Sequence, residues 1–345
     1  MKAGILSAGN WIRDHVKIID AWPKRGMLVN IRHELKGTGG APYNVLIDLV
    51  KLQVNLPLFA VGMIGNDDDG EYIMNDLQTN RIDVSYMYRT HEQPTSYTDV
   101  MTEEHSGYRT FFHCRGANAL LDVEHFWDIE TNAKIFHLGY LLLLDKMDAP
   151  DPEYGVKAAR VLDMMQRKGY QTSVDVVSEE GSRFRQVVIP CLPYVDYLIL
   201  NEIEAGETTG YRIRTDDNLI DPENLIQAAR SLLKGGVRKL VVIHFPEGGL
   251  AINSQGESVF EPSFQVAESE IRGTTGAGDA FCAGMLYGIH EGFTLKDMLR
   301  LANTCARFNL TSPTGTDGAV SLQKMMDFMK TARLREPILR IDRSI

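Results

Sequence analysis

A regular alternation of apolar strands and amphipathic helices in the second half of the chain constrains its fold more than any other feature. Short runs of continuous apolar residues, typical of buried strands, are separated by longer segments with apolar residues at helical spacing. We expect strands at 135–138, 172–177, 197–200 and 240–243, and helices at 154–168 and 222–234. Strands that are hydrophobic throughout and joined by helices form parallel sheets covered on both faces. The alternation therefore predicts an α/β fold built on a doubly wound, mainly parallel sheet with helices on both faces.

The N-terminal third departs from this alternation. It contains β-like runs at 4–7, 16–19 and 27–31, then a glycine cluster with a helix at 41–52 and an apolar strand at 58–64. Residues 85 to 115 look antiparallel, because runs at 84–88, 96–101 and 109–114 are rich in Tyr, Thr, Phe and Val. We expect the β-rich pieces from about 10–40 and 85–115 to form a small β-sheet that projects from the body as a lid. The whole chain, 1–345, is then a single domain with this lid.

Composition and charge limit the possible partners. The 345 residues carry 36 Lys and Arg against 46 Asp and Glu, a formal net charge of -10, which argues against general nucleic-acid binding. The longest apolar stretch, around Leu141 to Leu144, is far too short to cross a bilayer, and the first residues do not resemble a signal peptide. The four cysteines are widely spaced without a Cys-x-x-Cys pattern, so they are expected to be reduced. These features predict a cytoplasmic, enzyme-like protein without a nucleic-acid or membrane partner.

One segment, Thr275 to Phe281, joins a glycine-rich turn, an acidic residue and a helix start. A turn through Gly276 and Gly278 can point consecutive backbone N–H groups at one spot, and the positive end of the following helix adds to that field. This arrangement suits phosphate chemistry. Asp279 carries a negative charge beside a site built for negative charge, which suggests that it works on a proton. A tight turn with Asp279 as the helix cap explains the same segment equally well when it is taken alone.

A second glycine-rich segment, Gly37 to Asn44, also opens a helix. Gly39 and Gly40 allow a polar ligand to lie against the backbone, and Asn44, one turn further on, can both donate to and accept from hydroxyl groups. The segment lacks the third glycine of the dinucleotide-binding pattern, and the chain contains no Gly-x4-Gly-Lys-Ser/Thr phosphate loop. A structural turn is the alternative for this segment.

Two further candidate segments follow predicted strands. Asn201-Glu202-Ile203-Glu204-Ala205 places two carboxylates and an amide after the strand at 197–200, a set that suits Mg²⁺ bound through water, although a capped helix start needs the same residues. The segment 244–249, His-Phe-Pro-Glu-Gly-Gly, leaves the strand at 241–243, where its glycines could admit a nucleotide or form a plain hairpin. The acidic run Asp67-Asp68-Asp69 is better explained by helix capping than by calcium binding.

Taken together and in this order, these segments resemble the ribokinase-like family, also called the phosphofructokinase-B family of carbohydrate kinases. Residues 39–44 through 60–70 resemble its N-terminal signature, 201–205 its Asn-x-x-Glu motif, and 275–281 through Gly284 its C-terminal signature. The resemblance covers about residues 4 to 330. It implies ATP-dependent phosphorylation of a hydroxymethyl group on a small sugar or nucleoside, in a cleft covered by a small β-sheet lid.

The resemblance also implies roles for individual residues. Asp279 is expected to be the base that accepts the proton of the acceptor hydroxyl, and the amides of Gly276, Ala277 and Gly278 are expected to stabilise the transferring phosphoryl group. The residues expected to hold the acceptor are Asp14, Gly39, Gly40 and Asn44. Those expected to bind ATP and its magnesium ion are Asn201, Glu204, His244, Gly249, Thr275 and Asn303, with Glu204 reaching Mg²⁺ through water.

The sequence departs from the family pattern at three places. Gly273 stands where the family usually has an aspartate that is associated with monovalent-cation binding in some members, which puts activation by potassium in doubt. Residues 175–178 lack the Asp-x-Asn-x-Arg pattern of many relatives, and His244-Phe245-Pro246 replaces the commoner Thr-x-Gly turn. The acceptor stays open, because Gly40-Ala41-Pro42 is similar to fructokinases whereas residues 201–205 are similar to ribokinase.

Parts of the sequence also fit other functions and suggest an assembly state. A nucleoside kinase of the same fold, a non-catalytic sugar-binding regulator and a nicotinamide-dependent oxidoreductase are the alternatives, and the last is disfavoured by Phe281 where a third glycine is expected. Exposed edge strands of the lid predict a homodimer that pairs through the lid. Five further residues could form an aromatic wall of the lid that faces the acceptor, or could simply pack in the core. They are Trp11, Tyr43, Phe111, Phe112 and His113.

Overall fold

The body of the protein is built on one large sheet. The computed structural model describes residues 2–339, and within this range a nine-stranded sheet has the order β15-β14-β13-β12-β11-β8-β1-β4-β5. Its strands are β1 (Ile5–Gly9), β4 (Leu58–Gly65), β5 (Asp83–Thr90), β8 (Ile135–Leu141), β11 (Gln171–Val176), β12 (Tyr197–Asn201), β13 (Leu240–Phe245), β14 (Gly248–Asn253) and β15 (Ser258–Pro262). All neighbours from β13 to β5 pair in parallel, and only β14 and β15 are antiparallel. The predicted doubly wound, mainly parallel sheet is confirmed.

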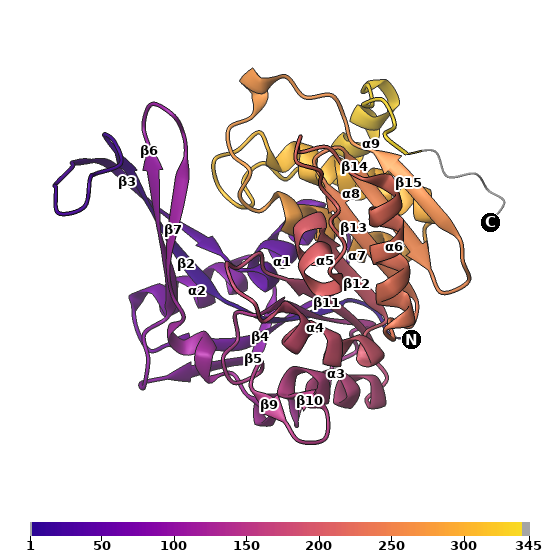
Figure 1. The fold of residues 1–345 in the computed structure, drawn as a ribbon. Coiled ribbons are helices and arrows are strands. Elements are labelled where there is room, and N and C mark those ends of the chain that lie inside the picture. Colours follow the sequence, from indigo (N-terminus) through magenta and orange to yellow (C-terminus); the bar gives the residue numbers. More distant parts are fainter. Residues whose placement is uncertain (1, 340–345) are drawn as a thin grey trace.

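Helices cover both faces of this sheet (Figure 1). They are α1 (Ala41–Lys51), α2 (Asp68–Thr79), α3 (Lys157–Arg167), α4 (Phe184–Cys191), α5 (Glu202–Thr209), α6 (Pro222–Lys234), α7 (Ala277–Glu291), α8 (Leu295–Asn309) and α9 (Leu322–Thr331). Side chains of a strand alternate between faces, so β13 gives Val241 and Ile243 to one core and Leu240 and Val242 to the other. The first core contains α3 to α6, and the second contains α1, α2, α7 and α8.

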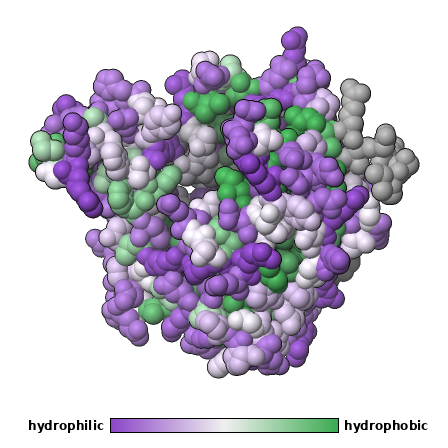
Figure 2. All heavy atoms as spheres, in the orientation of Figure 1, coloured by the Kyte–Doolittle hydropathy of each residue, from purple (hydrophilic) through white to green (hydrophobic). Residues whose placement is uncertain are grey.

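Four strands form a separate sheet that projects from the body as the lid. They are β2 (Ile12–Ile19), β3 (Ile31–Gly39), β6 (Ser96–Glu103) and β7 (Arg109–Cys114), in the order β3-β2-β6-β7. Figure 1 shows this sheet beside the body, and Figure 2 shows it as a lobe set off from the body by a notch. The central pair β2 and β6 is parallel, whereas β6 and β7 pair antiparallel, as expected for the runs at 96–101 and 109–114.

Two strand assignments need correction. The run at 84–88 was expected in the lid, but β5 is the edge strand of the main sheet, parallel to β4. It follows α2 directly, and a strand, helix and strand in succession return the chain to the same sheet. The run at 27–31 lies mostly outside any strand; β3 begins at Ile31 because it pairs with β2 from Ile31 opposite Ile19 to Gly39 opposite Ile12.

The remaining elements are short. A two-stranded hairpin consists of β9 (Pro150–Asp151) and β10 (Gly155–Val156), and 3-10 helices lie at Gly116–Leu120, Val123–Phe126, Leu192–Tyr194 and Glu268–Glu270. Among the described helices, none combines the length and the apolar composition that a membrane span requires.

Candidate active site

Asp279 lies in the first turn of α7 but does not cap this helix. The cap position belongs to Gly276, which has a left-handed backbone (φ 77°) and offers no side chain. The Asp279 carboxylate instead accepts hydrogen bonds from Asn44 Nδ2 at 2.6 Å and from the Tyr140 hydroxyl at 2.7 Å. Burial raises the pKa of Asp279, while these two hydrogen bonds lower it. The capping alternative is therefore wrong, and the site contains a buried carboxylate held by two donors.

The turn before α7 presents backbone amides at the positive end of that helix. Ala277 N–H donates to the Thr274 carbonyl at 3.2 Å, whereas in the described part of the chain the amides of Gly276 and Gly278 donate to no acceptor. A side chain at Gly276 would bring its Cβ within 2.2 Å of the Gly315 carbonyl oxygen, so the turn depends on glycine there. Of the three amides expected to bind an anion, two are free and the third closes the turn.

The start of α1 faces Asp279 from the N-terminal part of the chain. The helix begins after Gly40, whose backbone is left-handed (φ 91°) and whose Cβ would lie 2.0 Å from the Asn10 carbonyl oxygen. One turn into α1, Asn44 donates to Asp279, and its Oδ1 is buried with no hydrogen-bond partner among the described residues. A buried acceptor without a partner fits a ligand hydroxyl group.

The lid contributes Asp14, on β2. A Cβ on Gly39 would lie 2.5 Å from Asp14 Oδ2, so the glycine on the neighbouring strand makes room for this carboxylate. Burial, and then the charge of Asp279, raise the pKa of Asp14 to about 6 against the opposing effects of Arg13 and Arg109. Of the residues expected to hold the acceptor, Asn44 contacts Asp279, Asp14 interacts with its charge, and Gly39 and Gly40 lie beside Asp14 and the start of α1.

Asn201 and Glu204 form a reciprocal cap at the start of α5. Asn201 Oδ1 accepts from the amides of Ile203 and Glu204 at 2.9 Å, and Glu204 Oε2 accepts from the Asn201 amide at 2.8 Å. Glu204 Oε1 also accepts from the Ser178 hydroxyl at 2.7 Å. The capped helix start, which was the structural alternative for this motif, is therefore present.

Two buried carboxylates, Asp175 and Glu204, repel Asp279 and each other. Asp175 is the penultimate residue of β11, and burial followed by the charges of Glu204 and Asp279 raises its pKa well above the ordinary value. Burial also raises the pKa of Glu204 to about 7. Because a divalent cation would relieve this repulsion and prefers oxygen ligands, the donor set fits magnesium.

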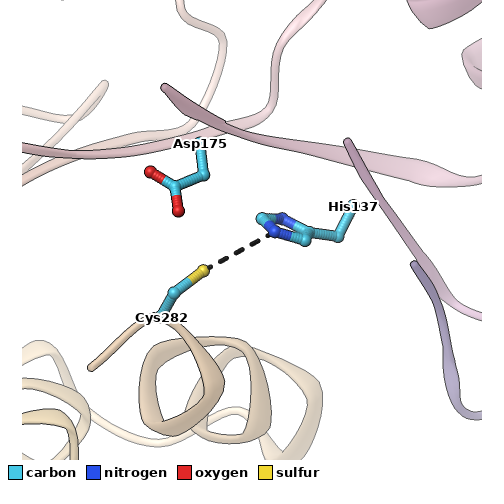
Figure 3. A group of neighbouring side chains, drawn as sticks. All are labelled: His137, Asp175 and Cys282. Atoms are coloured by element: carbon cyan, nitrogen blue, oxygen red, sulfur yellow. Dashed lines mark hydrogen bonds between the residues drawn. The ribbon is translucent and has the colours of Figure 1, made fainter. Parts of the chain in front are cut away.

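Asp175 also belongs to a buried group with His137 and Cys282 (Figure 3). These side chains come from β8, β11 and α7, their ligating atoms lie within 4.8 Å of one another, and His137 Nε2 is 3.9 Å from the Cys282 sulfur. Burial lowers the pKa of His137 to about 3, while burial and the acids raise that of the Cys282 thiol well above its usual range. The three side chains thus form one buried cluster between β8, β11 and α7.

His244, Gly249 and Asn303 make packing contacts. His244 lies beside Asn201 on β12 and Gly249 on β14, and its ring is tilted against Phe281 with centroids 4.8 Å apart. Burial lowers the pKa of His244 to about 4, so its ring is neutral. The segment 244–249 forms the β13–β14 hairpin, as its structural alternative predicted, and a Cβ on Gly249 would lie 3.0 Å from Leu299.

Asn303 lies on α8 with its side chain buried. Its Nδ2 donates to the Glu261 carbonyl at 3.0 Å, at the end of β15. This bond connects α8 to the edge of the sheet, which is a structural role that the sequence did not predict.

Two residues of the site escaped sequence reasoning. Tyr140 was missed because its strand was expected to end at 138, whereas β8 continues to Leu141 and carries this hydroxyl to Asp279. Arg109, at the start of lid strand β7, donates to the Thr275 hydroxyl and to the Pro313 carbonyl. Only the polar residue at the end of an apolar strand could have indicated Tyr140, and no local pattern indicated Arg109.

The aromatic residues expected to line the lid separate into two sets. Trp11 and Tyr43 are buried in the body, where Trp11 Nε1 donates to the Val61 carbonyl, so these two do not line the lid. Phe111 and Phe112 lie on β7 and are about half exposed, at 56% and 51%.

The sequence matches a known family along almost its whole length. The profile described as pfkB family carbohydrate kinase matches residues 4–321. Ribokinase of Mus musculus is 24% identical over 325 residues, covering 93% of each chain. The probable fructokinase-7 of Arabidopsis thaliana is 25% identical over 311 residues, covering 86% of this chain and 85% of the relative.

The three-dimensional structure is also similar to that of a ribokinase. The structure of Arabidopsis thaliana ribokinase complexed with ribose and ATP superimposes with a TM-score of 0.76 at 21% identity, covering 96% of this chain and 99% of that chain. This likeness supports the ribokinase-like architecture of the body and lid.

Proposed function

Because this chain belongs to the pfkB family of carbohydrate kinases, we propose that it transfers the γ-phosphate of ATP to a hydroxymethyl group of a small sugar or sugar-like acceptor. Membership makes it a phosphotransferase with an alcohol group as acceptor. The observation that carries the finer proposal is the Asp279 carboxylate, held by Asn44 and Tyr140 beside the free amides of Gly276 and Gly278.

Asp279 is the proposed base. Its two donors fix the orientation of the carboxylate, so one oxygen lone pair can receive the proton of an incoming hydroxyl group. Phosphoryl transfer depends mainly on positioning and charge stabilisation, and a carboxylate is basic enough to take the proton as the new bond forms. Burial raises the pKa of Asp279 toward that of a better base.

The glycine turn is the proposed anion site. The amides of Gly276 and Gly278 and the positive end of α7 stabilise the negative charge on the transferring phosphoryl oxygens. Thr275, the first residue of this turn, is the proposed phosphate contact through its hydroxyl. Ala277 contributes mainly by closing the turn, because its amide is already hydrogen-bonded.

The acceptor is proposed to lie between the lid and α1. Asp14 from the lid and Asn44 from α1 offer acceptors for sugar hydroxyl groups, and Asn44 Oδ1 has no partner in the described chain. Gly39 and Gly40 keep this space open, since side chains there would meet Asp14 and the Asn10 carbonyl. The short polar groups suit a hydroxyl-rich ligand more than a large apolar one.

Glu204 and Asp175 are the proposed holders of magnesium, with Asn201 orienting Glu204. Magnesium, when bound with ATP, neutralises charge on the phosphate oxygens. Asn201 donates to Glu204 at 2.7 Å, which fixes the carboxylate for ligation through water. His244 adjoins Asn201 in the sheet register and Gly249 adjoins His244, which supports a nucleotide lying across these strand ends. Asn303 is also proposed to lie near the nucleotide, and its hydrogen bond to the Glu261 carbonyl of β15 is the contact that supports this.

An acceptor screen tests this function. Release of ADP from Mg·ATP is measured over pentoses, hexoses, sugar phosphates and nucleosides, and thermal stability is measured with the same compounds and a non-hydrolysable ATP analogue, because ligands raise apparent stability. We expect one class of sugar to give both turnover and stabilisation. Turnover with nucleosides alone would favour the nucleoside kinase alternative. Stabilisation by sugars without ADP release would instead favour a non-catalytic regulator.

A homodimer through the lid is part of the proposal. β3 and β7 are the edge strands of the lid, and an unpaired edge is a surface for pairing with a second copy. Exposed apolar side chains on the lid support this, including Leu28 (85%), Leu35 (56%) and Phe111 (56%), and Figure 2 shows green patches on that lobe. Sedimentation at micromolar concentration should give the mass of two chains, and the mass of one chain would refute the dimer.

The proposed location is the cytoplasm. All four cysteines are free thiols, and three of them, Cys191, Cys282 and Cys305, are buried. Reduced cysteines are typical of reducing compartments. Cell fractionation that recovered the protein from an oxidising compartment would overturn this assignment.

A further inference from the structure

Arg109 joins the lid to the glycine turn. It is the first residue of β7, its Nη1 donates to the Thr275 hydroxyl, and its Nη2 donates to the Pro313 carbonyl at 3.2 Å. Thr275 opens the turn, and the loop that contains Pro313 and Gly315 packs against it, since a Cβ on Gly276 would lie 2.2 Å from the Gly315 oxygen. One guanidinium group from the lid therefore contacts both segments that shape the anion site.

These contacts do not neutralise the positive charge of Arg109. Within the described chain its hydrogen bonds go to a hydroxyl and a carbonyl and not to a carboxylate. Burial lowers the pKa of Arg109, and the charge of Asp14 opposes this shift. Since a guanidinium stays charged in proteins, it adds a fixed positive charge beside the free amides of Gly276 and Gly278.

Gly273 provides the space for this arginine. A Cβ at Gly273 would lie 3.0 Å from Arg109 Nη2 and 2.9 Å from the Ser312 carbonyl oxygen. Any side chain at this position would compete with the guanidinium for the loop carbonyls. The glycine and the arginine therefore form one arrangement, in which a cation of the chain itself lies between the two loops.

We propose that Arg109 is a positioning residue that ties the lid to the anion turn and supplies a built-in cation there, which makes turnover independent of monovalent cations. This inference rests on the proposed kinase function. The turn reaches its full charge only while the lid lies against it, so lid contact and phosphate stabilisation are coupled. Arg109 acts through Thr275 and the loop carbonyls, and the acceptor and Asp279 are held by other residues.

The variants that test this are Arg109→Met, Arg109→Lys and Thr275→Val, with Arg32→Met as the matched control. Arg32 is an exposed lid arginine that pairs with Asp20 and not with the turn. We expect Arg109→Met to lower kcat about 10- to 100-fold, the range typical for loss of a charge-assisted hydrogen bond, with a smaller change in the KM of the acceptor. Arg32→Met should retain the native kcat.

Two measurements distinguish a positioning role of Arg109 from a general structural defect: the coupling between the Arg109 and Thr275 variants, and the dependence of turnover on monovalent cations. Thr275→Val removes the Arg109–Thr275 contact together with the proposed phosphate contact of Thr275, so it should cost less in the Arg109→Met background than in the native background, because the shared contact is already lost there. The native enzyme should turn over equally in potassium and in tetramethylammonium salts, whereas potassium or guanidinium should partly restore Arg109→Met. Native kcat in Arg109→Met, additive losses in the double variant, or potassium activation of the native enzyme would each overturn the proposal.

A measurement without turnover distinguishes failure of this inference from failure of the proposed function. Hydrogen exchange at the Ala277 amide, which donates to the Thr274 carbonyl within the turn, should be faster in Arg109→Met than in the native protein and in Arg32→Met, because the turn loses its tie to the lid. Unchanged exchange in Arg109→Met refutes the tie whatever the enzyme phosphorylates. Faster exchange without any kinase activity in the native protein supports the tie and refutes the kinase assignment alone.

Discussion

Asn44 and Asp279, 235 residues apart in the sequence, are joined by a buried hydrogen bond of 2.6 Å from the amide Nδ2 to the carboxylate Oδ2. The bond connects the first turn of α1 with the first turn of α7, and these two helices pack on the same face of the sheet. The two glycine-rich segments of the sequence therefore build one site.

Replacing Asp279 by asparagine keeps the shape of the side chain and removes the proposed base. We expect kcat to fall about 100-fold or more, with little change in acceptor affinity, because a base acts on the proton in the transition state. A coupled ADP assay and calorimetry of acceptor binding measure the two effects. Asp216→Asn, on an exposed side chain, is the control, and near-normal turnover in Asp279→Asn would contradict the assignment.

Tyr140→Phe removes one donor to Asp279. The hydroxyl lowers the pKa of Asp279, so its loss should raise that pKa and move the acid limb of kcat/KM to higher pH. Turnover at neutral pH should fall about tenfold, as expected for a hydrogen bond to a charged group. Tyr154→Phe, which loses a bond to Asp163 outside the site, is the control. An unshifted pH profile in Tyr140→Phe would show that the hydroxyl does not tune Asp279.

The burial of Asp48 leads to a prediction of how the free energy of unfolding depends on pH. Both of its oxygens are buried without partners among the described residues, and burial, then the charge of Asp279, raises its pKa well above the ordinary value. A raised pKa in the folded state means that the contribution to stability is complete below the unfolded pKa and is lost as pH rises through the folded pKa. Between the two values this loss is at most about 1.4 kcal/mol per pH unit for one group.

The neutral variant Asp48→Asn tests the direction in which stability changes with pH. Its gain in free energy of unfolding over the native protein should be larger at pH 8 than at pH 5, as measured by urea unfolding at both pH values. An equal or smaller gain at pH 8 would mean that Asp48 is ionised and stabilised by a cation in the folded protein.

Gly276→Ala tests the turn before α7. Alanine at a left-handed backbone costs about 1 kcal/mol, and here the added Cβ would also meet the Gly315 oxygen at 2.2 Å. Gly256→Ala is the matched control, because Gly256 is also left-handed (φ 88°) but faces open space. Gly276→Ala should therefore lose more stability than Gly256→Ala in urea unfolding, and should also lose turnover. Equal losses in both variants would mean that the loop moves aside without cost.

Glu204→Gln tests the proposed magnesium residues. Removing this carboxylate should raise the magnesium concentration needed for half-maximal turnover about tenfold, because a ligand-orienting charge is lost. Glu207→Gln, an exposed residue on the same helix, is the control. An unchanged magnesium requirement would limit Glu204 to its role in the helix cap.

Local chemistry made much of the fold predictable. The strands β8, β11, β12 and β13 are buried along most of their length and separated by helices, so their parallel order follows from patterns a few residues long. The starts of α1 and α7 were equally visible, because only glycine tolerates the backbone at Gly40 and Gly276. Strand β5 was misplaced, since its Tyr and Val content suits either sheet and only its pairing with β4 decides between them.

The doubly wound body, the presence of a lid, and the glycine turns with their acidic and amide neighbours follow from patterns that are visible along the chain. Tertiary structure alone decided which side chains meet: the Tyr140 hydroxyl on Asp279, the guanidinium of Arg109 on Thr275, and the repulsion among Asp175, Glu204 and Asp279. The physical reason is the separation along the chain between the groups that interact. Backbone conformation and helix capping depend on neighbours in the chain, whereas hydrogen bonds and charge interactions across a site depend on how sheets and helices pack, and burial then sets their strength.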